Sequence, residues 1–372
     1  MTATATKRKT RVGGMTCEAR ALAAALRTVS AAVPTRSPKP ILQNVLISDG
    51  VVSATDLELK ITAPLPESSG HNFLLPHARL LTIVGLLHAD DEVTIAADGG
   101  LATVRGGNGE WKIPVEDVAE YPFPACGVSD AIARLPGDQL ASLVQAVRFA
   151  TDTDSSRFAL GAVLIEFKDG TLTFVGTDGR RLCIASCDID QATDDRDVLA
   201  PRRAIDVLVK LARSADAVQL SANASELVAD VDGVIVQARM VEGRFPRWRD
   251  ADKAHDATPS MVQAEALLAA VEQAAICTDE QSQAVTLTVS DDGLHVHGKS
   301  SAYGEAATTC DLVEVGHKVS TRLNPRFVRE WLSCGSIDPA EAVTLTIADK
   351  SSAVVLSIGE NTRTVIMPME DA

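Results

Sequence analysis

The chain has 372 residues, of which 46% are hydrophobic and 23% charged, and its formal net charge at pH 7 is −15. This chain is longer than a single hydrophobic core ordinarily supports, so we expect two or three domains. The longest apolar runs, such as residues 80–87, are too short to cross a bilayer, and no secretory apolar segment follows the basic start. We therefore expect a cytoplasmic protein without a membrane partner, and a flexible basic tail at residues 1–10. The acidic charge argues against a protein that coats DNA phosphates with lysine and arginine.

The first predicted element is an amphipathic helix at residues 19–33, followed by two strands joined at Asp49-Gly50. Asp-Gly suits the positive φ angles of a tight hairpin. A second helix is expected to begin at Pro76, because proline is favoured in a first helical turn, where its missing amide would have been unpaired. A strand at 92–97 and a further hairpin complete the segment, which ends at Pro124.

This plan is repeated twice more along the chain. Each copy has a helix, an Asp-Gly turn, a proline that opens a second helix, a strand and a closing proline. In the second copy these are residues 139–149, Asp169-Gly170, Pro201, 217–222 and Pro246. In the third copy they are residues 263–276, Asp292-Gly293, Pro325, 342–347 and Pro368. The closing prolines are each 122 positions apart. The sequence thus predicts an α+β fold of three tandem domains, each with two helices that cover antiparallel sheet. We place the domains at 11–127, 128–252 and 253–372, with seams near 125–130 and 250–259.

Residues 293–300 match the Gly-x4-Gly-Lys-Ser pattern of a phosphate loop, which makes a nucleotide-binding protein the competing hypothesis. A phosphate loop needs a strand before it and a helix after it, so that amides at the helix start bind phosphate. Here the variable positions alternate Leu, His, Val and His, as in a strand, and the following residues also favour strand. Lys299 lies 122 positions after Thr177, which lies 122 after Thr55, so we interpret the lysine as a strand residue.

The remaining candidates for chemistry are weaker. Seven scattered cysteines show no zinc-knuckle spacing and are interpreted as reduced structural thiols: Cys17, Cys126, Cys183, Cys187, Cys277, Cys310 and Cys334. His295 and His297 share one strand face, but no third metal ligand is near in sequence. Residues 177–181 by themselves indicate a strand end with a turn. We find no constellation of catalytic residues and predict a protein without enzyme activity, cofactor or metal.

The chain resembles the β subunit of bacterial DNA polymerase III, the DNA sliding clamp family, over about residues 11–372. The resemblance is carried by the triplication and by four segments: Val175-Gly-Thr-Asp-Gly-Arg-Arg-Leu182, Val198-Leu-Ala-Pro-Arg-Arg203, Val241-Glu-Gly-Arg-Phe-Pro246 and Met367-Pro-Met369. It implies a DNA clamp fold in which two chains close head to tail into a ring. Sheets then run outside and across domain seams, and helices line a hole roughly 30 Å across, given about 8–10 Å between packed helix axes.

A clamp holds DNA by encirclement, so the resemblance turns the acidic charge into a prediction that positive charge gathers inside the ring. The second helix of each copy does carry basic residues. Arg36 also matches a family position near the DNA path. The residues expected to face DNA are therefore Arg36, Arg79, Arg202, Arg203, Lys210, Arg213, Arg326 and Arg329.

The resemblance also implies a pocket that accepts a short linear motif from partners, namely the polymerase III α subunit, the clamp loader and other clamp-binding proteins. The matching residues are Leu160, Thr177, Gly179, Arg180, Arg181, Leu182, Pro246, Val365, Ile366, Met367, Pro368 and Met369. Methionine and leucine suit an adaptable apolar cleft. At the seam of the homodimer, Trp111, Ile276 and Cys277 match family positions.

The sequence departs from the family at both ends. The chain finishes Met369-Glu370-Asp371-Ala372, where the family commonly has a basic and then an apolar residue, and the basic N-terminal extension is unusual. These differences leave open a divergent clamp, carried by a phage or mobile element or conferring resistance to a clamp-binding inhibitor.

Overall fold

The computed structural model describes residues 14–66, 71–122, 131–152, 158–189, 195–252, 256–278 and 284–370. The expected basic tail, the seam at 125–130, Cys126, Pro124 and the last two residues lie outside these ranges. The chain forms two compact units, Met1–Ser129 with Val228–Arg239, and Asp130–Leu227 with Met240–Ala372. In the described ranges, no helix combines the length and apolar character needed to span a bilayer.

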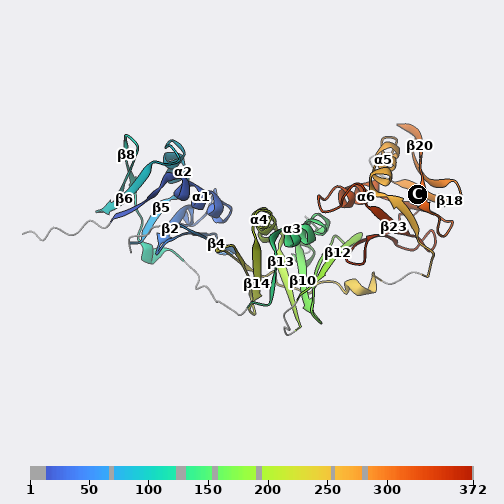
Figure 1. Ribbon diagram of the computed structural model, residues 1–372, viewed down its shortest axis with the longest axis horizontal. Helices are drawn as coiled ribbons and strands as arrows, with labels where there is room; N and C mark the ends of the chain where they lie inside the picture. The colour runs from blue at the N-terminus through green and yellow to red at the C-terminus, as the bar shows by residue number, and fades with distance from the viewer. Residues whose placement is uncertain are drawn as a thin grey trace, which may run out of the picture. The chain divides into compact units, whose positions relative to one another are not determined.

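The first unit contains one helix pair and two groups of antiparallel strands (Figure 1). Helices α1 (Ala19–Val29) and α2 (His77–Gly85) pack together, and α1 also packs on β3 and β4. One sheet has the order β1 (Gly14–Glu18), β6 (Glu92–Asp98), β7 (Leu101–Gly106), β8 (Gly109–Pro114). The other strands follow the order β5 (Phe73–Pro76), β2 (Asn44–Ser48), β3 (Val51–Thr55), β4 (Leu59–Pro64), β16 (Val234–Arg239), β15 (Glu226–Val231).

The second unit is built on a sheet of nine strands that joins the second and third sequence copies. Its order is β13 (Arg196–Pro201), β10 (Ala162–Lys168), β11 (Thr171–Thr177), β12 (Arg181–Asp188), β25 (Thr362–Ile366), β24 (Val354–Ile358), β23 (Ala342–Thr346), β17 (Ser260–Gln263), β21 (Leu312–Glu314). Strand β12 of the second copy pairs antiparallel with β25 of the third, with Leu182 opposite Val365. The expected sheet across a domain seam is therefore present between these two copies.

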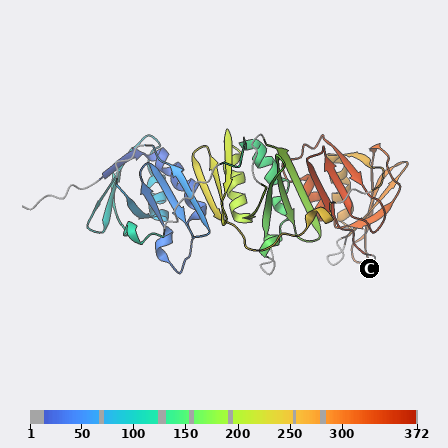
Figure 2. The ribbon, with the colours of Figure 1, turned by 90° about the horizontal axis from the view of Figure 1, so that it is seen from below.

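Two helix pairs accompany this sheet. Helices α3 (Gly137–Gln145) and α4 (Arg202–Ala212) pack together, as do α5 (Ala264–Ala275) and α6 (Pro325–Leu332). In Figure 2 the strands of the long sheet lie nearest the viewer and these helices lie behind them. The unit is completed by β9 (Ala133–Pro136), which pairs with β14 (Ala217–Ala222), and by a sheet in the order β20 (Gly304–Cys310), β19 (Gly293–Ser300), β18 (Val285–Ser290), β22 (Ser320–Leu323).

The local signals in the sequence were mostly correct. Asp49 and Asp169 have φ angles of 45° and 51° ahead of their glycines, as expected for tight hairpins, whereas Gly293 has φ 134° and Asp292 is not in the left-handed region. Pro325 opens α6, and Pro76 and Pro201 stand at the N-cap of α2 and α4, one position earlier than a first-turn proline. The predicted helices 19–33 and 139–149 were too long, since each ends in a separate short 3-10 turn.

The long sheet has an apolar core cluster at the join of β12 and β25. Leu182, Ile184, Trp248 and Val365 are all buried there, together with Val175 and residues of β10 and β13. Burial of such side chains stabilises the fold by about 1.5–3 kcal/mol each relative to exposure. The surface above this cluster therefore rests on closely packed strands of both copies.

Candidate functional site

The phosphate-loop pattern is one continuous strand in the structure. Residues 293–300 form β19, which pairs with β18 on one side and β20 on the other. Lys299 is 70% exposed and lies 3.9 Å from Glu305 on β20, and the element that follows β19 is this strand, not a helix. Gly298 has a packing role, because a Cβ there would lie 2.0 Å from the carbonyl oxygen of Ala274 at the end of α5. Gly176, 122 positions earlier, meets the carbonyl oxygen of Val147 in the same way, at 2.4 Å.

The two histidines of β19 pair with neighbouring polar side chains. His295 contacts Asp292 and Thr309, and Nε2 of His297 lies 2.7 Å from Oε1 of Glu305. The hydrogen bond from His297, with the charges of Lys299 and His297, lowers the pKa of Glu305. In the described part of the chain, no three His, Cys, Asp or Glu side chains are grouped so that they could hold a metal ion.

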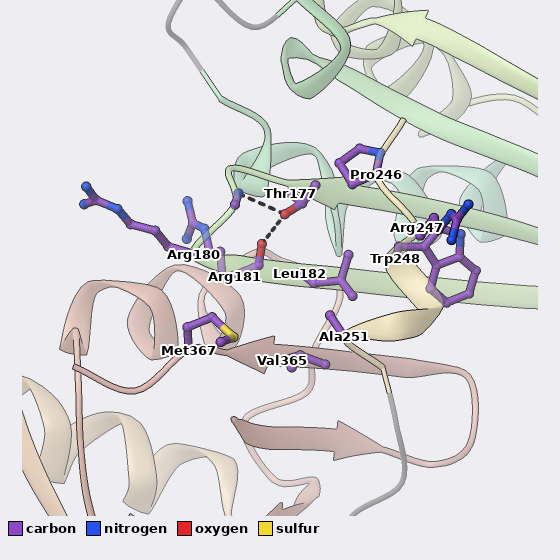
Figure 3. A pocket seen from close by; sticks show the side chains of 11 residues that line it. Thr177, Arg180, Arg181, Leu182, Pro246, Arg247, Trp248, Ala251, Val365 and Met367 are labelled. Atoms are coloured by element: carbon purple, nitrogen blue, oxygen red, sulfur yellow. Dashed lines mark hydrogen bonds between the residues drawn. The ribbon is translucent and has the colours of Figure 1, made fainter. Parts of the chain in front are cut away.

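A cavity of about 200 Å³ opens beside the join of β12 and β25 (Figure 3). Its walls come from the end of β11 and the turn into β12, from the segment after β16, and from β25. The lining residues are Thr177, Gly179, Arg180, Arg181, Leu182, Pro246, Arg247, Trp248, Ala251, Val365 and Met367. Leu182, Trp248 and Val365 belong to the core cluster beneath, so the floor of the pocket is apolar and packed.

The turn between β11 and β12 is held by its own side chains. The Thr177 hydroxyl donates to the carbonyl of Arg181 and accepts from the amide of Gly179, as the dashed lines in Figure 3 show. Asp178 accepts from the amides of Arg180 and Arg181. Gly179 has φ 84°, which suits glycine because it lacks a Cβ.

The same turn occurs in the first unit, 122 positions earlier. Thr55 donates to the carbonyl of Leu59 and accepts from the amide of Leu57, and Asp56 accepts from the next two amides. Leu57 has φ 84° and is 42% exposed, where the second copy has Gly179. The repeat in the sequence is thus a repeat of hydrogen bonds.

The guanidinium of Arg181 is buried and fully engaged. Its side chain is 3% exposed. It donates to Asp178 at 3.1 Å, to Glu330 of α6 at 2.5 Å and to the carbonyl of Phe149 at 3.0 Å. It also lies over the rings of Phe149 and Phe327, at 5.1 and 4.6 Å from their centroids. Arg181 therefore joins the second copy to the third, and its charge is balanced by these partners.

The segment 246–252, which forms another wall, is attached to both copies. Arg249 stacks on Trp248 and makes a two-point ion pair with Glu166 of β10. Asp252 makes a two-point ion pair with Arg363 of β25. Two-point arginine–carboxylate pairs fix orientation as well as distance. The positions of Arg247, Trp248 and Ala251 are consequently set by β10 of the second copy and β25 of the third.

The structure places eight of the twelve pocket residues expected from the sequence in the lining. The other four do not line it: Leu160, Ile366, Pro368 and Met369. Ile366 is fully buried opposite Arg181 in the sheet, and the amide of Met369 bonds the carbonyl of Arg322, away from the cavity. Arg247, Trp248 and Ala251 were missed, although all three lie within five positions after the Gly-Arg-Phe-Pro motif.

Most of the basic residues expected to face DNA are exposed. This holds for Arg36, Arg79, Arg203, Lys210, Arg213, Arg326 and Arg329, while Arg202 is half-buried. Within this set, Arg202 bonds Thr151, Arg213 bonds Gln145 and Arg326 bonds Glu330. Helix α4 carries three basic residues and one acid, which contrasts with the net charge of the chain.

The residues expected at a dimer seam lie at the ends of their sheets and helices. Trp111 is half-buried in β8, the last strand of its sheet. Ile276 caps the C-terminus of α5 and is 75% exposed, and Cys277 beside it is half-buried.

The elements and this pocket define a three-domain clamp fold of helices and antiparallel sheets. Family models for the DNA polymerase III β subunit match its N-terminal domain at residues 14–125, its central domain at 134–247 and its C-terminal domain at 254–370. The chain belongs to the family of DNA polymerase III β subunits.

Individual relatives match this chain along nearly their whole length. The chain is 24% identical to the β sliding clamp of Haemophilus influenzae, covering 92% of this chain and 96% of that one. A sliding clamp structure from Bacillus subtilis, 19% identical, superposes with a TM-score of 0.89 over 97% of this chain and 100% of that one. A sliding clamp from Pseudomonas aeruginosa bound to griselimycin, 23% identical, gives 0.87 over 96% of this chain and 100% of the other.

Proposed function

We propose that the chain is a DNA sliding clamp, a processivity factor that encircles duplex DNA and tethers the replicative polymerase. The observation that carries this proposal is the succession of three β-subunit domains in their family order along one chain. The matches begin at residues 14, 134 and 254, which supports domain bounds of 11–127, 128–252 and 253–372. Clamps named as such are among the relatives with which the chain aligns over 92% of its length.

The proposed mode of DNA binding is topological, not a tight grip on phosphates. Two chains would close head to tail, with Trp111 of one chain opposite Ile276 and Cys277 of the other. Strand β8 and strand β20 each end a sheet in the described structure, so each offers unpaired backbone groups that a seam would satisfy. The exposed basic residues of α2, α4 and α6, with Arg36, would then face the duplex and make weak, salt-dependent contacts.

The second proposed activity is the docking of partner peptides in the pocket beside β12 and β25. An apolar floor of Leu182, Trp248 and Val365 with an exposed Met367 at its edge suits a short apolar motif. Partners would include the polymerase III α subunit, the clamp loader and other clamp-binding proteins. A related clamp in a solved structure binds griselimycin, which supports a ligand pocket in this fold. Short motifs bind at about micromolar strength, and two pockets per ring raise the effective concentration.

The proposed clamp is a cytoplasmic, non-catalytic subunit that needs no cofactor. The strand structure of residues 293–300 supports the non-catalytic part of this proposal, because a strand at these residues argues against a phosphate loop.

The test is loader-dependent retention on nicked circular DNA, measured by gel filtration before and after the circle is cut. A clamp stays on the closed circle and is lost from the linear product. Equal retention on both would overturn topological binding, because a protein that grips phosphates does not distinguish the two forms. Coverage of the linear ends by a tight end-binding protein should restore retention, which separates sliding from simple dissociation.

A further inference from the structure

Three arginines line the pocket, and only two have charge available for a ligand. Arg181 is held by Asp178, Glu330 and a backbone carbonyl. Within the described ranges, the side chains of Arg180 and Arg247 are exposed and take part in no hydrogen bond or ion pair. They come from different walls: Arg180 from the turn before β12, and Arg247 from the segment after β16.

Three carboxylates that hold the walls of the pocket are paired with arginines other than Arg180 and Arg247. Asp178 is bonded to Arg181, Glu166 to Arg249, and Asp252 to Arg363. Among the described residues, the pocket lining itself contains no aspartate or glutamate, so the charges of Arg180 and Arg247 are not cancelled within the lining. In a chain with net charge −15, this is a local excess of positive charge beside an apolar floor.

The two guanidinium groups lie at opposite ends of the apolar lining. In Figure 3, Arg180 extends beyond Met367 at one side, and Arg247 lies beside Trp248 at the other, with Leu182, Val365 and Ala251 between them. A ligand that fits this arrangement is an extended segment whose centre is apolar and whose two ends carry negative charge.

We propose that the pocket selects linear motifs flanked by aspartate or glutamate, and that Arg180 and Arg247 are its specificity-determining residues. This inference rests on the proposed docking function and names the class of partner peptide that the site takes. The motif's apolar side chains bind over Leu182, Trp248 and Val365, while acidic residues on either side pair with Arg180 and Arg247. Because both arginines are solvent-exposed, their contribution is one of selectivity among apolar motifs and depends on salt.

The test compares two peptides that share the apolar centre Leu-Ala-Leu-Leu and the same neutral fluorophore. One carries Asp-Asp at both ends, and the other carries Asn-Asn, which has similar shape without charge. Binding to the full-length protein is measured by fluorescence anisotropy at about 0.05 M and about 0.5 M salt, where screening lengths differ several-fold. The acidic peptide is expected to bind roughly three- to tenfold more tightly at low salt, and the preference should shrink at high salt.

Two double variants complete the experiment. R180Q/R247Q should abolish the preference and leave the affinity for the Asn-flanked peptide unchanged. R134Q/R244Q removes the same charge at exposed positions outside the lining and should keep the preference, which controls for net charge. Equal binding of the two peptides by the unmodified protein would overturn the inference and leave docking intact. A preference for the acidic peptide that survives in R180Q/R247Q would have the same meaning. If neither peptide binds at millimolar concentration, docking in this pocket and the inference are both overturned.

Discussion

Arg181 of β12 and Glu330 of α6 are 149 positions apart in the chain and meet at 2.5 Å between Nη1 and Oε2. Glu330 also accepts from Nε of Arg326 at 2.6 Å, so one carboxylate holds a buried arginine on one side and an exposed one on the other. Burial opposes ionisation of Glu330, but the hydrogen bonds and charges of Arg326 and Arg181 outweigh it and lower its pKa. The contact stabilises the join between the second and third copies and thereby one wall of the pocket.

The first prediction concerns this carboxylate. Glu330→Gln should lower the free energy of unfolding by about 2–3 kcal/mol at pH 7, because the buried Arg181 loses one of its two ionised partners and keeps only Asp178. A carboxyl whose folded pKa is depressed stabilises the fold above its unfolded pKa, about 4.3, and this stabilisation is lost as pH falls through the folded value. Urea unfolding at pH 7 and at successively lower pH should therefore show the difference from the unmodified protein shrinking below about pH 4. Arg326→Gln, which removes only the exposed partner, is the matched control, and an equal loss in that variant would contradict the assignment.

The second prediction separates the two kinds of pocket residue. Met367 is 48% exposed, so Met367→Ala should weaken peptide docking about tenfold while unfolding changes by less than about 0.5 kcal/mol. Arg181→Ala should instead destabilise the protein by about 3–5 kcal/mol, because Glu330 and Asp178 lose a buried partner. Thermal unfolding and peptide titration of both variants distinguish the roles. If R181A kept full stability and lost only docking, Arg181 would be a ligand contact after all.

The turn at 177–181 shows what local sequence can predict. Thr, Asp and Gly at these spacings bond their own backbone, so a strand end with a turn follows from the residues themselves. The partner of Arg181 does not, because Glu330 is brought to it only by the pairing of β12 with β25 and the packing of α6. Trp248 was missed for a similar reason: it becomes a wall only once Glu166 and Arg363, from two different strands, fix the segment around it.

The closing prolines are equally spaced in the sequence, but they do not lie at equivalent positions in the structure. Strand β16 ends at Arg239, seven positions before Pro246, whereas β25 ends at Ile366, two before Pro368. Differences in loop length between the copies compensate one another, so the equal intervals do not mark equivalent points. The interval of 122 is structurally exact at Thr55 and Thr177, where the same hydrogen bonds recur, and at Gly176 and Gly298, where a helix carbonyl approaches the strand.

The third prediction follows from the strand structure of the phosphate-loop pattern. Lys299→Ala should leave unfolding within about 0.5 kcal/mol of the unmodified protein, because the side chain is largely exposed. Neither protein should bind ATP in equilibrium dialysis with magnesium present. Saturable ATP binding that disappears in K299A would revive the nucleotide hypothesis.

The fourth prediction tests the DNA-facing surface. Lys210 of α4 and Arg329 of α6 are exposed, and within the described structure neither side chain is paired. K210Q/R329Q should reduce the salt slope of weak binding to short linear duplex by about 1–2, since fewer counterions are released. Retention on a closed circle should not change, because encirclement does not depend on these contacts. The control K168Q/K350Q removes two exposed lysines outside the predicted surface, and an equal loss of slope there would place the DNA elsewhere.

The last prediction concerns the ring seam at Ile276. A side chain that is 75% exposed contributes little to the fold of one chain, yet an isoleucine at a seam loses its hydration when the partner covers it. Ile276→Asp should therefore convert dimers to monomers of about 39.2 kDa in analytical ultracentrifugation, with thermal unfolding of the monomer little changed. Val313→Asp is the matched control, because Val313 is also exposed, at 58%, but lies in β21 at the end of the long sheet. Dimers that persist in I276D, or that dissociate only in V313D, would move the seam away from α5. Loss of retention on circular DNA in I276D, with peptide docking preserved, would show that the seam serves encirclement and the pocket does not depend on it.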